Sequence, residues 1–188
     1  MRLGAPVLRA LMGGLFIGHG TQKLFGWFNG PGLEGFSGMM EKMQMRPARR
    51  HALLAGGAEA GGGALLALGA LTPLATAMLT GSMTTAIRKV HAPNGPWVTS
   101  GGWEYNAVLV AALMALAEHG PGSPSVDDTV FPRLHGTGWA LAALGAGIAG
   151  SFVVDRPPFN QPPAPAEPEA RTGRFERTEQ PVEATPSG

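Results

Sequence analysis

Three ionisable side chains that could do chemistry lie well inside two mostly apolar stretches of the chain. His19 and Lys23 stand four residues apart near the end of the stretch 6–27, and Glu59 lies among alanine and glycine in the stretch 51–70. Histidine and glutamate can exchange protons, and a lysine can stabilise negative charge that develops on an oxygen atom. These residue types predict a site for proton-linked chemistry, with His19, Lys23 and Glu59 as its catalytic candidates.

The positions of these residues within their stretches predict that they meet. If both stretches are helices, Glu59 lies eight residues after His51, where the second helix begins, and His19 lies eight residues before Trp27, where the first ends. That length of helix rises about 12 Å, so His19 and Glu59 reach the same depth. Lys23 shares a helix face with His19, and its long side chain can reach Glu59.

The following helix adds a line of polar residues that leads toward the same side. Thr80, Thr84 and Arg88 recur at steps of four, and Thr84 and Arg88 are candidates to bind a quinone-like ligand. Three interpretations of the cluster remain open. Lys23 and Glu59 can form a purely structural ion pair, because buried charges need partners. The cluster can instead exchange protons with a quinone-like ring, or paired histidines can ligate a haem.

The elements that must position these residues are long and apolar. Five stretches, at 6–27, 51–70, 73–90, 103–120 and 134–154, have the character of membrane spans. About 20 residues at 1.5 Å each cross a hydrocarbon core of about 30 Å. Charged residues make up 14% of the chain, against about 25% in ordinary soluble domains. The sequence therefore predicts an all-α integral membrane protein.

Composition excludes several other classes of site and partner. The chain contains no cysteine, which excludes disulfides, thiolate catalysis and cysteine-ligated iron–sulfur clusters. Its net charge of +1 gives no sign of a nucleic-acid partner. A run of methionines within 39–45 could bind copper(I), but the favoured interpretation is the adaptable apolar face of an amphipathic segment over 33–43. No metal site is predicted.

Small residues predict close helix packing. Gly57 and Gly61 are spaced by four residues, and a longer stripe of this kind runs from Gly138 through Ala142 and Ala146 to Gly150. Such stripes let helix backbones approach one another.

Prolines and basic residues predict a tail and an orientation. Eight of the 17 prolines fall within 155–188, so this segment is expected to be disordered. Lys and Arg gather in the first and third predicted loops, which places those loops in the cytoplasm, the N-terminus outside and the C-terminus inside.

Three motifs resemble those of a known family. The first helix ends in His19-Gly20-Thr21-Gln22-Lys23-Leu24-Phe25-Gly26, the second contains Ala58-Glu59-Ala60-Gly61-Gly62-Gly63, and residues 120–127 read Gly-Pro-Gly-Ser-Pro-Ser-Val-Asp. In this order they resemble the DoxX family over about residues 1–128. The resemblance implies a compact four-helix transmembrane bundle over 1–128, followed here by an additional helix over 134–154 and the tail over 155–188.

The resemblance also implies a function. Known DoxX members resemble subunits of terminal quinol oxidase or thiosulfate:quinone oxidoreductase assemblies. We therefore expect an accessory or quinone-handling subunit of an oxidoreductase in the inner (plasma) membrane, in contact with lipid and partner proteins, with a quinone as its cofactor and no covalently bound group. The motif residues carried over are His19, Lys23, Glu59 and Asp127, and Asp127 is expected to cap a helix start with Ser125. Whether the chain has activity alone stays open. The alternative is a non-enzymatic membrane protein, either a small proton-coupled transporter or an assembly factor.

Overall fold

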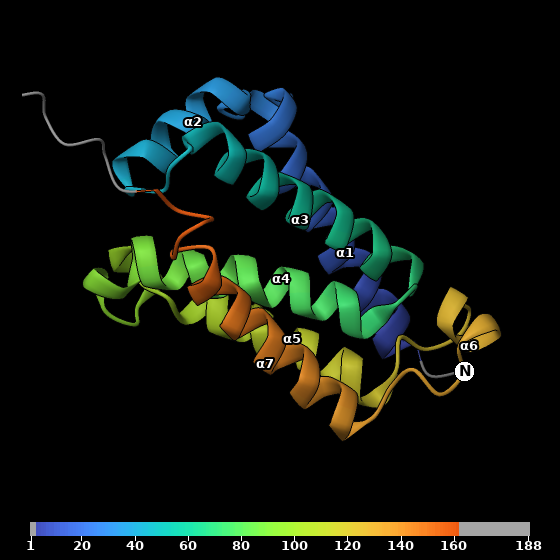
Figure 1. The fold of residues 1–188 in the computed structure, drawn as a ribbon. Coiled ribbons are helices and arrows are strands. Elements are labelled where there is room, and N and C mark those ends of the chain that lie inside the picture. Colours follow the sequence, from blue (N-terminus) through green and yellow to red (C-terminus); the bar gives the residue numbers. More distant parts are fainter. Residues whose placement is uncertain (1–2, 162–188) are drawn as a thin grey trace, which may run out of the picture.

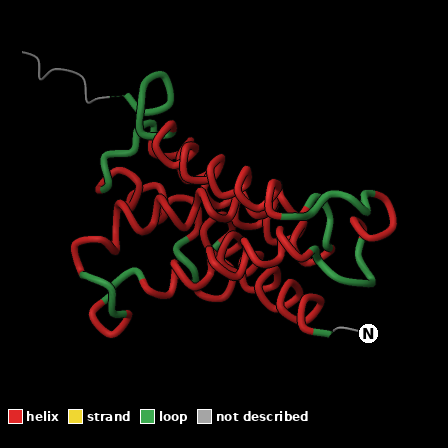
Figure 2. Tube along the Cα trace, turned by 90° about the horizontal axis from the view of Figure 1, so that it is seen from below, coloured by secondary structure: helices red, strands yellow, loops and turns green. Residues whose placement is uncertain are grey.

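The computed structural model describes residues 3–161, which form helices joined by turns (Figure 1, Figure 2). The long helices are α1 (Gly4–Phe25), α3 (Ala48–Leu68), α4 (Thr72–Ala86), α5 (Glu104–His119) and α7 (Thr137–Val153). Between them lie η1 (Trp27–Asn29), α2 (Gly32–Lys42), η2 (Ile87–His91), η3 (Ala92–Asn94), η4 (Val98–Ser100) and α6 (Val126–Val130). The all-α class is confirmed, and the long helices coincide with the predicted apolar stretches to within a few residues.

Glycines set the distance between α1 and α3, which pack side by side (Figure 1). A Cβ atom on Gly13 would lie 2.6 Å from the backbone nitrogen of Ala67, and one on Gly63 would lie 2.8 Å from the carbonyl oxygen of Gly13. Real Cβ atoms do not come so close, so both positions require glycine. Gly57 and Gly61 have more room around them, so the closest contact lies on a neighbouring face of α3. Because small residues occur on every turn of α3, their spacing in the sequence did not indicate which face of the helix packs against α1.

Helix α7 is an integral part of the bundle, because it packs along α4, which also contacts α3 and α5. The closest point is Gly147, where a Cβ atom would lie 2.7 Å from both the Ala77 carbonyl oxygen and the Thr80 Cβ. The buried residues of α7 are Ala140, Ala143, Gly147 and Ser151. The predicted stripe that ends in Gly138 and Gly150 is exposed instead. The packing face is therefore displaced from that stripe by about one residue position.

Asp127 holds the turn between α3 and α4. Its carboxylate accepts hydrogen bonds from the backbone N–H groups of Leu71, at 2.7 Å, and Thr72, at 2.8 Å, and from the Thr72 hydroxyl at 2.6 Å. Asp127 therefore caps α4. Ser125 Oγ accepts from the Asp128 N–H and caps α6. The expected helix cap at Ser125 is present, whereas Asp127 caps a different helix, which is distant in sequence.

The same end of the bundle is fastened by Arg9 of α1. Its guanidinium is buried and donates hydrogen bonds to the carbonyl oxygens of Ala67 in α3 and of Pro121 and Pro124 in the segment between α5 and α6. These bonds connect three parts of the chain that are far apart in sequence. A buried charge of this kind is tolerated because several backbone acceptors surround it.

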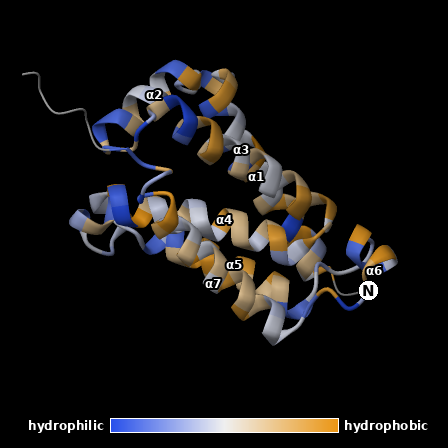
Figure 3. Cartoon of the chain, in the orientation of Figure 1, coloured by the Kyte–Doolittle hydropathy of each residue, from blue (hydrophilic) through white to orange (hydrophobic). Residues whose placement is uncertain are grey.

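The outer surface of the bundle carries many large apolar side chains. Val7 and Leu11 of α1, Val108 of α5, and Leu141 and Phe152 of α7 are all exposed. Hydrophilic residues gather around α2 and where α4 leads into η2 (Figure 3). None of the helices between residues 3 and 161 combines the length with the apolar character that a membrane crossing needs.

Residues 155–161, the C-terminal strap, are packed against the bundle. Asp155 forms ion pairs with Arg88 Nη2 at 2.7 Å and Lys89 Nζ at 2.9 Å. Composition assigned this segment to the disordered tail, and the structure differs because Asp155 neutralises two cations that follow α4. Residues 162–188, the rest of the predicted tail, lie outside the described residues.

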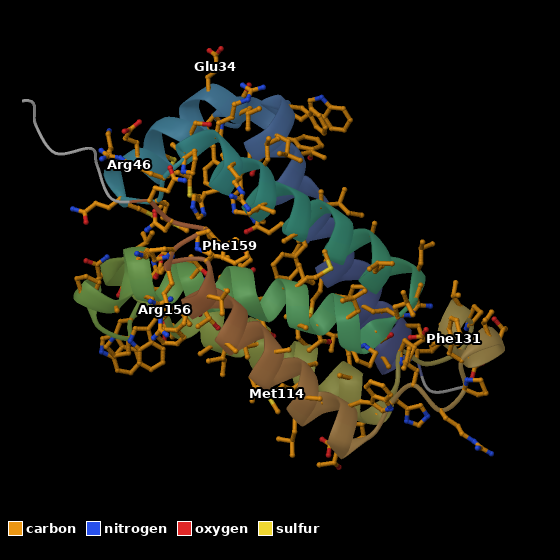
Figure 4. The ribbon with its side chains drawn as sticks, in the orientation of Figure 1. Glu34, Arg46, Met114, Phe131, Arg156 and Phe159 are labelled. Atoms are coloured by element: carbon orange, nitrogen blue, oxygen red, sulfur yellow. The ribbon has the colours of Figure 1, made fainter. Side chains whose placement is uncertain are left out.

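The strap then crosses to the α2–α3 side of the molecule, with Phe159 between that side and α4 (Figure 4). His51 Nε2 donates to the Phe159 carbonyl oxygen at 3.1 Å, and the Arg46 N–H donates to Asn160 Oδ1 at 2.7 Å. Arg50 lies over the Phe159 ring, with its guanidinium carbon 5.4 Å from the ring centroid. The strap therefore connects the end of α7 to the start of α3.

Candidate functional site

Lys23 and Glu59 form a buried ion pair between α1 and α3. Lys23 Nζ lies 2.5 Å from both carboxylate oxygens of Glu59, and Ser82 Oγ of α4 donates to Glu59 Oε1 at 2.6 Å. The Glu59 side chain is 2% exposed and that of Lys23 is 26% exposed. The carboxylate thus accepts hydrogen bonds from two helices, and such charge-assisted bonds are the strong ones in proteins.

The packing of α1 on α3 places these two residues opposite each other. Gly20 of α1 is buried against Gly56 and Ala60, where an added Cβ atom would lie 2.7 Å from the Gly56 carbonyl oxygen and from the Ala60 Cβ. The two helices run antiparallel, so Lys23 lies level with Gly56, where an added Cβ atom would be 3.5 Å from the Lys23 Cβ. From there the long Lys23 side chain reaches the Glu59 carboxylate, one turn further along α3. The depth matching that predicted their meeting agrees with this geometry.

A first cavity, of about 240 Å³, opens from the ion pair between α1 and α5. Its polar lining is His19, Lys23, Glu59, His91, Tyr105 and Asn106, and its apolar lining is Met12, Leu15, Phe16, Met83, Ala86 and Leu109. Ligand pockets usually measure about 300–1,000 Å³, so this volume suits a single ring better than a haem. Polar groups from four segments of the chain converge on this space.

His91 enters the site because of the π-helical turn η2. This wider turn follows α4 directly and ends at His91, whose Nδ1 donates to the Gly101 carbonyl oxygen at 2.7 Å. In the neutral ring this bond leaves Nε2 as the acceptor nitrogen. Single π turns inside helices are often found at functional sites.

A second, larger cavity lies on the other side of the ion pair, between α2 and α3 on one wall and α4 and α7 on the other. Its volume is about 470 Å³, and its lining is mostly apolar, with methionines and small residues. The methionines are Met39, Met40, Met43, Met45 and Met78. Within residues 3–161, no group of three or more His, Cys, Asp or Glu side chains is placed to hold a metal ion.

The ion pair forms part of the wall between the two cavities. Lys23, Glu59, Ala86 and His91 line both. A small molecule in either cavity would therefore contact the same charged groups. This arrangement was not visible from sequence, which placed the charges at one depth but did not indicate open space on two sides of them.

The structure brings three of the predicted site residues together and separates two others. His19, Lys23 and Glu59 line the first cavity. Thr84 and Arg88 line neither cavity. Steps of four along α4 do keep these residues on one face, but that face packs on α7.

Arg88 is occupied by structural contacts with α7 and the strap. It donates to the Ser151 carbonyl oxygen at 2.6 Å and to Asp155, and its guanidinium carbon lies 3.8 Å from the centroid of the Phe152 ring. The ligand-binding role predicted for Thr84 and Arg88 therefore has no support in the geometry.

Sequence reasoning missed Ser82 and gave no role to His91. Ser82 lies two positions from Thr80, which turns it by about 200° to the side of α4 that faces α3. In the structure Ser82 lies one turn after Met78, whose side chain faces Gly61 and Gly62 of α3. The sequence could have indicated the depth of Ser82 along α4, but not the direction of its side chain. For His91 the signal was absent, since a π turn cannot be read from this sequence.

The helical bundle and its buried ion pair point to a class of small helical proteins with an internal polar site. Residues 4–92, just under half of the chain, match the model of the DoxX family. The matched region includes His19, Lys23, Glu59, Ser82 and His91, while α5, α6 and α7 lie beyond it. No curated protein and no solved structure matches the chain.

Proposed function

We propose that this protein is an integral membrane protein that binds a quinone ring in the first cavity and serves as an accessory or quinone-handling subunit of a membrane oxidoreductase. The observation that carries the proposal is the ion pair of Lys23 and Glu59 at the wall of a ring-sized cavity. His19, exposed on α1, lines that cavity one turn before Lys23. The quinone carries the electrons and protons, and the electrons come from a partner subunit of the complex.

The cavity offers suitable groups for the two carbonyl oxygens of a quinone ring. Lys23 Nζ can donate to an oxygen and stabilise negative charge on it. His19 and Glu59 can take up and release protons. Asn106 is buried at the opposite side, where its Nδ2 lies 3.3 Å from Met83 Sδ, a weak acceptor. An amide donor with such a partner is available to a better acceptor from a ligand.

The membrane location is supported by the family and by the exposed apolar side chains of α1, α5 and α7. Clusters of Lys and Arg mark the cytoplasmic side. They lie at the end of the bundle that contains the α2–α3 turn and η2, and the strap lies there too. A cysteine introduced at Ser123 should react with a membrane-impermeant reagent in spheroplasts, whereas one at Gly35 should react only after the membrane is opened. The reverse labelling pattern would invert the orientation.

The binding proposal is tested by equilibrium titration of the purified protein, in mild detergent, with a benzoquinone that carries no side chain. The wild-type protein should bind it saturably, and Lys23→Met and Glu59→Gln should weaken binding by about tenfold or more, because each removes a group at the cavity wall. Lys42→Met and Glu34→Gln, at exposed positions of α2, are matched controls that should leave binding unchanged. Absence of saturable binding, or equal binding by all variants, would refute the proposal.

The two cavities also favour a second candidate, proton-coupled transport, since an ion pair with open space on both sides can alternate between them. In this case the protein in sealed vesicles should carry protons down a pH gradient without any quinone, and Glu59→Gln should abolish the flux. Quinone binding without proton flux would favour the oxidoreductase subunit.

A further inference from the structure

The second cavity has the properties of a compartment for an apolar chain. It is bounded by Ala55 and Ala58 of α3 and by Gly81, Gly147 and Gly150 of α4 and α7, and a Cβ atom added at Gly150 would meet nothing within 4 Å. Methionines supply much of the remaining wall, and their flexible side chains adapt to a ligand of irregular shape. The charged groups in its lining are the same Lys23 and Glu59 that line the first cavity, with His51 and His91 as further polar residues.

The position of the second cavity relative to the ion pair fits one ligand with a ring and a chain. Because Lys23, Glu59, Ala86 and His91 line both cavities, a ring in the first would lie next to the second. From Glu59 the second cavity reaches His51, eight residues earlier in α3. This distance is about 12 Å along the helix axis, and a linear chain could follow it.

The strap lies near the far end of this path. Val154, just before the strap, lines the second cavity, and His51 at its far end donates to the Phe159 carbonyl oxygen at 3.1 Å. A chain that enters beside the ion pair would therefore run between α3 and α4–α7 and end beneath the strap.

We infer that the second cavity binds the apolar side chain of a quinone whose ring lies in the first cavity. The substrate class is therefore a quinone with an alkyl or isoprenoid chain, rather than a free ring. This inference rests on the proposed function and deepens it. Apolar burial should make the chain a major source of affinity, because two buried methylene groups are enough for about a tenfold change in Kd.

Gly150 provides the sharpest test, because it lines the second cavity and a Cβ atom added there would meet nothing within 4 Å. Gly150→Leu should therefore fill the cavity without disturbing the backbone of a neighbouring helix. Gly145 of the same helix also has nothing within 4 Å of an added Cβ, and it lines neither cavity, so Gly145→Leu is the matched control. Ala58→Leu fills the cavity from the opposite wall and serves if Gly150→Leu fails to fold.

The experiment compares the dissociation constants of a chain-free benzoquinone and of the same ring with a decyl chain, in one detergent. The wild-type protein and Gly145→Leu should bind the decyl compound at least about tenfold more tightly than the ring. Gly150→Leu and Ala58→Leu should lose about tenfold or more of that advantage and bind the ring as the wild type does.

The outcomes separate the two proposals. If the ring binds but the decyl chain adds nothing, or if its advantage survives in both filling variants, the chain does not occupy the second cavity and this inference is wrong, while the proposed function stands. If neither compound binds the wild-type protein, both proposals fail. Competition by a fatty acid against the decyl compound, but not against the ring, would show that the compartment accepts apolar chains from lipid as well.

Discussion

Removing one partner of the Lys23–Glu59 pair should destabilise the protein strongly, and unequally for the two partners. Lys23→Met leaves the Glu59 carboxylate, 2% exposed, with the hydroxyl of Ser82 as its remaining hydrogen-bond donor. Stranding a buried charge in this way costs about 3–5 kcal/mol. The effect is large because the low-polarity surroundings cannot replace the lost ammonium group.

Glu59→Gln should cost less, about 1–2 kcal/mol of unfolding free energy, although it breaks the same contact. Lys23 is 26% exposed and its Nζ also lies 5.1 Å from the centroid of the Phe36 ring, so the ammonium keeps part of its hydration and a cation–π contact. The glutamine amide can still accept a hydrogen bond from Ser82. The order of the two single variants is therefore part of the prediction.

The double variant tests whether the two residues act as a pair. Because neither charge is stranded when both are removed, its loss of stability should be about 1–3 kcal/mol smaller than the sum of the single losses. The measurement is the free energy of unfolding in mixed micelles, followed by circular dichroism as a denaturing detergent is added. The controls are Lys42→Met and Glu34→Gln, alone and together, at exposed sites on α2. Additive effects for Lys23 and Glu59 would refute the reasoning, since they would show that the charges do not stabilise each other.

Three further changes test the packing and the strap. Gly20→Ala should destabilise the protein by about 3 kcal/mol, because its Cβ would overlap α3. Gly18→Ala, with nothing within 4 Å of its added Cβ, is the control and should be neutral or slightly stabilising. Equal thermal midpoints for the two variants would contradict the α1–α3 contact. Asp127→Ala should cost about 2–3 kcal/mol through the lost cap of α4, while Asp128→Ala, at an exposed position, should change little in the same melting assay. Phe159→Ala should lower the free energy of unfolding by about 1 kcal/mol through the lost cation–π contact, and an unchanged value would show that the strap adds no stability.

Depth along a helix was the information that sequence supplied most reliably. The helix period and the apolar boundaries of α1 and α3 were enough to place Lys23 beside Glu59, because only the position along each helix axis was needed. The direction of each side chain around the helix axis was harder to predict. Thr84 and Arg88 lie at suitable depth but face α7, while Ser82 faces Glu59.

Contacts between segments that are distant in sequence were beyond single-sequence reasoning. Asp127 was expected to act locally, but its carboxylate caps α4 across 55 positions of sequence. The strap shows the same limit, because its composition is typical of disorder while Asp155 and Asn160 each find polar partners on the bundle. The chemical role of His19, Lys23 and Glu59 stays a prediction.

The fastening by Arg9 and Asp127 at one end of the bundle has a mechanical consequence for the other. With that end fixed, the α1–α3 pair and the α4–α5–α7 group can move relative to each other about a hinge at the α3–α4 turn (Figure 1). Helix α3 has 21 residues and is about 30 Å long, so a rotation of about 5° at the pivot would move its far end by about 3 Å. Such leverage would widen the second cavity most at its end near His51, which the strap contacts. The hydrogen bond from Ser82 to Glu59 and the strap would oppose this opening, together with the apolar core shared by the two helix groups.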